Sequence, residues 1–274
     1  NPDAKFQFMS DILRWSISTV IMVINLILHY NDIKVEWVDF TCLLVLIAQE
    51  FIIWIVSRSF FRKFYKFPID LELFQTRWGI WVMIVIGESV LQLLVHDLNT
   101  HRLIHDYCFT LFSLTILFSL AMQYYDSCQR KWFEHAITKS AAAGMFWIWL
   151  HPIMTFFLFG IGAGLKMANA NDYKDSYNIS YQSNLLISTC MGMVTLCFSL
   201  MRFAHLNFSL QDYRQFFLFA IRALLSALQI AIVHFVETGA HGHGLQVIIS
   251  QMVISVFGFN LIDISFEVFY ADKY

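Results

Sequence analysis

Eight apolar runs divide this chain of 274 residues, and each is long enough to cross a hydrocarbon core about 30 Å thick. A segment inside a bilayer must satisfy its own backbone polar groups, and a helix does so within one segment. Charged residues make up only 14% of the chain, against about 25% in soluble domains. We therefore expect an all-α, polytopic transmembrane bundle of about eight helices. The runs fall at about 12–30, 36–57, 77–97, 105–125, 140–166, 184–205, 214–236 and 244–267.

The runs follow one another without an internal repeat, which predicts a single transmembrane domain over residues 1–274. The opening Asn-Pro-Asp-Ala-Lys is typical of the middle of a chain, so we expect this domain to be the carboxy-terminal part of a longer protein. Lys and Arg together number 18 against 20 Asp and Glu, so no nucleic-acid partner is expected.

The sequence has no P-loop, nucleophile elbow, HExxH or CxxC motif, so we predict neither an enzyme nor a cofactor. Histidines gather at the segments expected on the outer surface, where they could sense pH or bind zinc. None of the known zinc spacings is present, so no metal site is predicted. These histidines are His29, His96, His101, His105, His234, His241 and His243.

The distribution of Lys and Arg predicts the orientation of the chain. Most of them fall before the first run, between the second and third, fourth and fifth, and sixth and seventh, and after the eighth. By the positive-inside rule these segments face the cytoplasm, so both ends of the chain are expected there. The sequon Asn178-Ile-Ser180 lies in the 167–183 loop on the opposite side, where it could be glycosylated.

A basic segment with interleaved aromatic residues, Arg58–Lys66, follows the second run. Arg62, Lys63 and Lys66 could hold anionic lipid headgroups at the membrane surface. The alternative is an ordinary positive-inside loop without a specific partner.

The third run carries an ionisable residue near its centre. Gln92 and His96 follow Glu88 at i+4 and i+8, on one face of a helix. A carboxyl at mid-bilayer costs about 2.5–3.5 kcal/mol, so such residues usually face the bundle interior and are functional. We expect this stripe to face inward, with His151 at similar depth, as a transport or proton-relay site. The alternative is an interhelical hydrogen bond with Glu88 permanently protonated.

Arg222 lies inside the seventh run, at a depth similar to Glu50 in the second run and Asp263 in the eighth. Asn260 shares a helical face with Asp263. This predicts a buried ion pair between Arg222 and one of the two acids. Such a pair could form a gate or an anion contact, or it could simply fix the register of the helices.

Several short motifs resemble the bacterial low temperature requirement A (LtrA) family. Thr76-Arg77-Trp78-Gly79 and Gly87-Glu88-Ser89 resemble its Glu-Arg-aromatic-Gly start and Gly-Glu-small end, with threonine in place of the first acid. Gln123-Tyr124-Tyr125-Asp126 resembles its aromatic-aromatic-Asp helix end, and His151 with Gly160–Gly164 its His and Gly-rich helix. The resemblance covers roughly 70–166. It implies a polytopic membrane fold and this set of residues, without a substrate.

Three functional interpretations follow from these features. The first is a secondary transporter or channel for a small solute or ion. Its transport could be coupled to protons through Glu88 and His151. The second is a non-catalytic structural subunit of a larger membrane complex or a homo-oligomer. The third is a lipid-binding membrane protein that uses the basic aromatic segment. We expect the first.

Overall fold

The computed structural model describes residues 71–94, 104–127, 135–171, 177–205, 213–237, 244–259 and 261–262, with residues 16, 17, 19, 20 and 23. The chain forms two compact units, Asn1–Ile69 and Asp70–Tyr274, and the fold described below is that of the second. The single domain over residues 1–274 stays a prediction.

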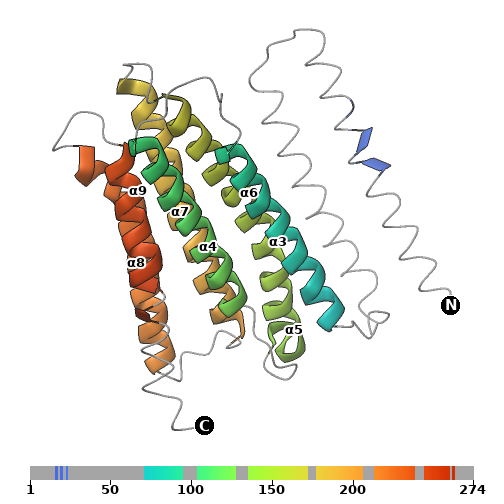
Figure 1. Cartoon of the computed structure of the whole chain (residues 1–274). Helices are drawn as coiled ribbons and strands as arrows, with labels where there is room; N and C mark the ends of the chain where they lie inside the picture. Colours follow the sequence, from blue (N-terminus) through green and yellow to red (C-terminus); the bar gives the residue numbers. More distant parts are fainter. Residues whose placement is uncertain are drawn as a thin grey trace. The chain divides into compact units, whose positions relative to one another are not determined.

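The second unit is an up-and-down bundle of helices that lie side by side, with the short helix α5 at its lower end (Figure 1). No strand occurs among the described residues. The helices are α3 (Leu71–Leu94), α4 (Ile104–Ser127), α5 (Ala136–Lys139), α6 (Ala141–Asn171), α7 (Tyr177–His205), α8 (Tyr213–Glu237) and α9 (Gly244–Met252), and a π-helix, η2 (Val253–Phe259), continues α9.

Five of these helices, α3, α4, α6, α7 and α8, are long and apolar enough to cross a membrane. They correspond to the third through seventh predicted runs. The described part of the eighth run contains α9 and η2, which are shorter. The first two runs lie outside the described residues, apart from five positions of the first, so the number of about eight spans stays a prediction.

Helix α7 lies at the centre of the unit and packs against α4, α5, α6, α8 and α9. Two thirds (67%) of its most apolar stretch is buried, against 28% for α8. Because α7 has neighbours on most sides, its polar residues cannot all turn outward. The buried polar groups of the unit therefore gather around this helix.

Glycines bring the helices close to α7. A Cβ at Gly164 of α6 would come within 2.7 Å of the Ile187 side chain, and one at Gly160 within 2.5 Å of Cys190 Sγ. These two glycines, four residues apart on one face of α6, thus let α6 and α7 approach closely. On the other side of α7, a Cβ at Gly192 would lie 2.6 Å from the backbone oxygen of Ser226.

The junction between α5 and α6 is held by side-chain caps. His135 precedes α5 with extended backbone, and its Nδ1 accepts a hydrogen bond from the Ile137 amide over 3.2 Å. Ser140 separates the two helices, and its hydroxyl accepts from the Ala143 amide at 3.1 Å. These contacts satisfy amide groups that the start of a helix leaves unpaired.

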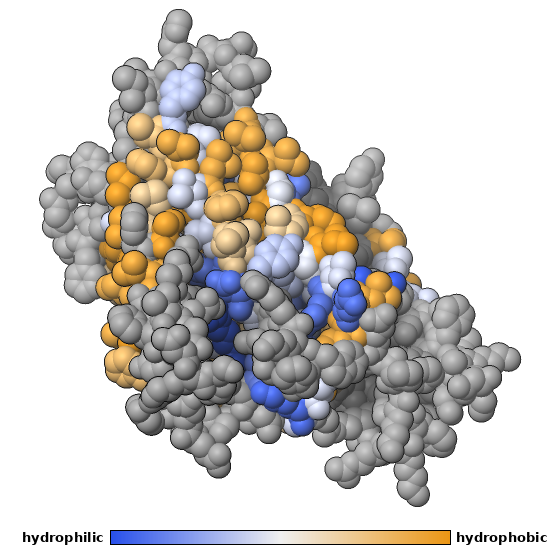
Figure 2. Space-filling view, turned by 60° about the horizontal axis from the view of Figure 1, so that its bottom comes forward, coloured by the Kyte–Doolittle hydropathy of each residue, from blue (hydrophilic) through white to orange (hydrophobic). Residues whose placement is uncertain are grey.

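The outward faces of the spanning helices are apolar, as lipid contact requires. Large exposed side chains include Ile84 of α3, Phe118 of α4, Phe156 of α6 and Leu224 of α8. Among the coloured residues in Figure 2, hydrophobic side chains cover most of the upper part of the visible face, and hydrophilic ones gather below them. The apolar helices and their outward faces identify an integral, multi-pass membrane protein.

One connection differs from the expectation. The predicted loop 167–183 is largely helical, since α6 continues to Asn171 and α7 begins at Tyr177. The sequon at Asn178 therefore lies in the first turn of α7 rather than in a loop. Both helices extend past the apolar runs, because polar residues can remain helical outside the hydrocarbon layer.

Candidate functional site

Two helices carry buried polar stripes that face one another. In α7 the stripe consists of Asn184, Ser188 and Thr195, and in α8 of Arg222, Ser226 and Gln229. Residues at i, i+4 and i+7 or i+11 share a helical face, and all six side chains are at most 3% exposed. Such burial indicates an interhelical contact made by hydroxyl and amide groups.

Thr195 joins the two stripes. Its Oγ1 lies 2.7 Å from Gln229 Oε1 and 3.0 Å from Ser226 Oγ. The Ser226 hydroxyl in turn lies 2.9 Å from the backbone oxygen of Arg222. Ser226 is one residue from the centre of α8, which spans 213–237. The contact therefore lies near the middle of the membrane.

Gln251 of α9 connects a third helix to this contact. Its Nε2 donates to Ser188 Oγ over 3.0 Å and to the backbone oxygen of Gln229 over 2.8 Å. One amide group thus bridges α7, α8 and α9. Removing it would leave several polar groups without partners in a region that excludes water.

The π-helix η2, which continues α9, connects α4 to this group of helices. The backbone oxygen of Ser255 accepts hydrogen bonds from Gln123 Nε2 at 3.1 Å and Ser119 Oγ at 3.3 Å, both on α4. Short π segments within helices are frequent at functional sites. We call the whole arrangement the polar seam. It consists of Ser119, Gln123, Asn184, Ser188, Thr195, Arg222, Ser226, Gln229, Gln251 and Ser255.

Four polar atoms of the seam are buried without a hydrogen-bond partner in the structure. They are Gln229 Nε2, Gln251 Oε1, Asn184 Oδ1 and Ser255 Oγ. An unpaired buried polar group costs about 1–3 kcal/mol, so native proteins keep few of them. The four atoms lie along the seam, where they could form hydrogen bonds to a polar molecule.

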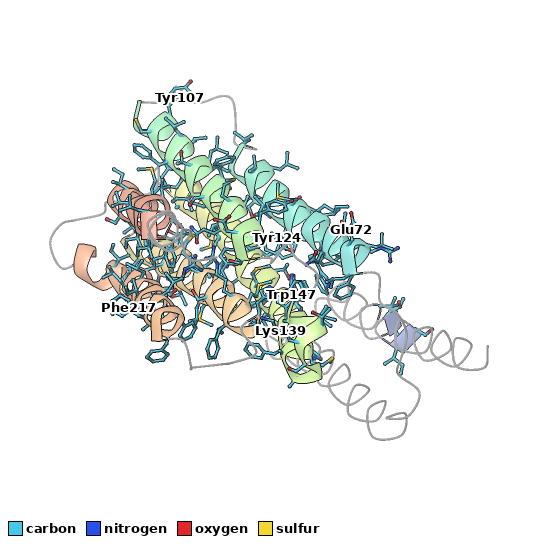
Figure 3. The ribbon with its side chains drawn as sticks, turned by 90° about the horizontal axis from the view of Figure 1, so that it is seen from below. Glu72, Tyr107, Tyr124, Lys139, Trp147 and Phe217 are labelled. Carbon is cyan, nitrogen blue, oxygen red and sulfur yellow. The ribbon has the colours of Figure 1, made fainter. Side chains whose placement is uncertain are left out.

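A second cluster, the imidazole layer, lies toward the α5 end of the bundle. It consists of Trp78, Tyr124, His135, Trp147, His151 and His205. Ring centroids are 4.1 Å apart for Trp147 and His151, and 4.7 Å apart for Trp147 and His135. Tyr124 and Trp147 lie inside the bundle, whereas Tyr107 and Phe217 lie at its outside (Figure 3). The layer is aromatic and tightly packed.

The hydrogen bonds of His151 define its tautomer. His151 directly precedes Pro152, and its Nδ1 donates to the Trp147 backbone oxygen over 2.9 Å. The other ring nitrogen, Nε2, then accepts from the Tyr124 hydroxyl at 3.3 Å. A neutral imidazole satisfies both contacts. His151 is fully buried, so its role here is to join α6 to α4.

His135 and His205 hold the short helix α5 in place. His205 Nδ1 accepts from the Ala136 amide at 2.9 Å, and Lys139 Nζ donates to the His205 backbone oxygen. Because His135 Nδ1 accepts a hydrogen bond from the Ile137 amide, protonation of Nδ1 would break this bond. Burial lowers the pKa of His135 from 6.5 to about 4. This histidine is therefore neutral near pH 7.

The predicted helix-end motif lies beside the imidazole layer. Tyr124 contacts His151, and the Asp126 carboxylate lies 3.8 Å from the Arg202 guanidinium. The Tyr125 ring packs edge-on against Tyr124 at 5.5 Å. The three residues thus tie the end of α4 to α6 and α7.

The stripe predicted on α3 does not face the interior of the second unit. Glu88 is exposed and Gln92 half-buried, and Gln92 Nε2 donates to Glu88 Oε1 at 3.3 Å. The buried face of α3 contains Val82, Val85, Ile86, Ser89 and Leu93 instead. Within the second unit this apolar face packs inward, and Glu88 lies on the side away from it. The functional role of the stripe stays a prediction.

Within the part of the chain that the structure describes, Glu88 and His151 make no contact with each other. Glu88 is exposed, whereas His151 is buried. His96 lies outside the described residues.

Arg222 is buried, at 3% exposure, as its depth in the sequence suggested. Its predicted partners Glu50 and Asp263 lie outside the described residues, and so does Asn260. The ion pair therefore stays a prediction. Arg62, Lys63 and Lys66 also fall outside, and no group of three metal-ligating side chains occurs in the part of the chain described.

Most of the polar seam was missed by the sequence reasoning. The sequence singles out Arg222 and Gln123, but not Thr195, Ser188 or Gln251. The signal was present as polar residues spaced by four and seven along the sixth run. Serine and threonine in a membrane helix often bond to their own backbone, so their spacing alone does not identify an interhelical network.

Comparison with known proteins gives one match. The family model described as bacterial low temperature requirement A protein (LtrA) matches residues 3–250. This range includes every helix from α3 to α8 and the seam from Ser119 to Gln229. No curated protein and no solved structure matches the chain.

Proposed function

Because the chain belongs to the LtrA family of membrane proteins, we propose that its polar seam carries a small solute across a membrane. The protein acts as a secondary transporter or channel, without enzymatic chemistry. Its substrate meets hydroxyl and amide groups contributed by α4, α7, α8, α9 and η2.

The unpaired atoms of the seam carry this proposal. A structural contact between helices gains most when each donor meets an acceptor. Here Gln229 Nε2 and Gln251 Oε1 remain unpaired although their residues are adjacent. A passing solute gains hydrogen bonds at these atoms and so recovers part of the energy lost on leaving water.

The imidazole layer supports the seam rather than forming the path. Trp147 and His151 are fully buried among aromatic rings, and His151 has partners at both ring nitrogens. In this proposal the layer is the rigid floor of the bundle on its α5 side. It keeps α4, α6 and α7 together while the seam changes.

Orientation and partners complete the proposal. The α5 end faces the cytoplasm, together with both ends of the chain, because Lys139 and Arg202 lie there. Arg62, Lys63 and Lys66 are proposed to contact anionic lipids on that side. A homo-oligomer is compatible with this arrangement. Proton coupling, where it occurs, is assigned to Glu88 on α3.

Reconstitution of the full chain into liposomes tests the proposal. We expect the protein to raise the flux of at least one small solute above that of empty liposomes, and Gln229→Leu to reduce this flux at least tenfold. Leu224→Val, at an exposed apolar position of the same helix, is the matched control. Equal flux through Gln229→Leu and the control would favour a structural subunit instead.

A further inference from the structure

We infer that the solute carried by the polar seam is a small, uncharged organic molecule that both donates and accepts hydrogen bonds, the class of urea and short polyols. This inference rests on the proposed function and specifies its substrate. It follows from the chemistry and mutual position of the unpaired atoms.

The unpaired atoms offer both kinds of hydrogen bond. Gln229 Nε2 offers donors, and the amide oxygens of Gln251 and Asn184 offer acceptors. The Ser255 hydroxyl can do either. A solute that only accepts would leave the amide oxygens unpaired, and one that only donates would leave Gln229 unpaired. A molecule with both functions satisfies the whole set.

These atoms belong to neighbouring residues. Gln251 is hydrogen-bonded to Ser188 and to the backbone of Gln229. Asn184 lies one helical turn before Ser188, and Ser255 lies four residues after Gln251. Each unpaired group is therefore within about one turn, near 5.4 Å of helix, of the bridge formed by Gln251. This spacing suits a solute of a few heavy atoms.

The seam offers no free charge to an ion. All four unpaired atoms are neutral, and the one ionisable side chain of the seam is Arg222. Its positive charge repels cations, and its side chain already takes part in an interaction within the protein. Burying an ion without a counter-charge costs far more than burying an amide. An uncharged solute avoids this cost.

Stopped-flow light scattering on proteoliposomes of the full chain tests this inference. The probes are urea, glycerol, potassium chloride and sodium formate, each as an osmotic gradient across the same vesicles. We expect urea or glycerol to enter at least tenfold faster than into empty liposomes, with both salts unchanged. Gln251→Leu should reduce the organic solute flux at least fivefold, and Leu224→Val should leave it unchanged.

A second variant covers the case in which Gln251→Leu fails to fold. Ser255→Ala removes one unpaired hydroxyl and no recorded side-chain bond, and we expect it to shift the ratio of glycerol to urea flux. An unchanged ratio and rate in Ser255→Ala would contradict the inference.

The outcomes separate this inference from the proposed function. Salt flux without urea or glycerol flux would overturn the substrate class while the transport role stands. Accelerated water flux alone would do the same. No acceleration of any probe would overturn both.

Discussion

Thr195 of α7 and Gln229 of α8 are joined by a hydrogen bond of 2.7 Å near the middle of the bundle. The bond, with the 3.0 Å contact between Thr195 Oγ1 and Ser226 Oγ, links the two helices through polar groups. It is also the point at which structural and functional roles of the polar seam can be separated, because its energy and its effect on flux can be measured in the same variants.

Thr195→Val should destabilise the protein by about 0.6–1.7 kcal/mol, the range of interhelical hydrogen bonds in membranes. The substitution keeps the shape and leaves the Gln229 amide with fewer partners. Unfolding in detergent measures the change, and a double-mutant cycle with Gln229→Leu isolates the pair. Thr115→Val is the control, because the Thr115 hydroxyl bonds the Leu111 carbonyl of its own helix. Equal effects at both threonines would contradict the prediction.

Gly192→Ala should cost about 1–3 kcal/mol through overpacking. The added Cβ would lie 2.6 Å from the backbone oxygen of Ser226 and would also contact Ile230, and the backbone of α8 cannot move aside locally. Gly87→Ala is the matched control, since a Cβ at Gly87 meets nothing within 4 Å. Thermal unfolding of the two variants in one detergent compares them. A Gly192→Ala variant as stable as Gly87→Ala would contradict the close approach of α7 and α8.

Stability should fall as the pH is lowered from 6.5 to 4. Unfolded His135 takes up a proton near pH 6.5, whereas the folded protein resists protonation until the lowered pKa of about 4. The stabilisation is therefore complete above pH 6.5 and is lost as the pH falls through this window. His135→Asn keeps a side chain suited to the helix start and removes this titration, so its melting temperature should depend less on pH. Identical pH profiles would show that His135 contributes nothing.

Glu88→Gln should fold normally, since Glu88 is exposed and its recorded partner is the Gln92 amide. If Glu88 couples transport to protons, the variant should lose pH-driven flux while retaining flux down a solute gradient. Both are measured in proteoliposomes with and without an imposed pH difference. Undiminished pH-driven flux would exclude Glu88 as the coupling residue.

The spanning helices could be predicted from hydropathy because the bilayer fixes their length. The runs at 105–125 and 214–236 lie within α4 and α8 to within one or two residues of an end. Helix α5 escaped prediction, since its four residues are too few for any periodicity. The change from α9 to the π-helix η2 also escaped, because an apolar run is equally compatible with either hydrogen-bond pattern.

The site was harder to predict than the fold for a related reason. Glu88 is conspicuous in the sequence because burying a carboxylate within an apolar run costs free energy whichever way the side chain points. Its actual direction depends on which face of α3 packs, and Val82, Ser89 and Leu93 decide that. Gln251 carries no charge and so gives a weak signal alone. Its importance arises only when three helices meet around it.

The central position of α7 also constrains how the protein is made. When α7 enters the membrane, α8 and α9, which follow it in the chain, have not yet been inserted, so Ser188 and Thr195 lack the interhelical partners of the folded protein. Until α8 and α9 are inserted, the polar side chains of α7 face lipid or remain in contact with the insertion machinery. Chains truncated after α7 should accordingly be degraded quickly. Insertion of α8 and α9 would then be the step that protects the newly made protein from degradation.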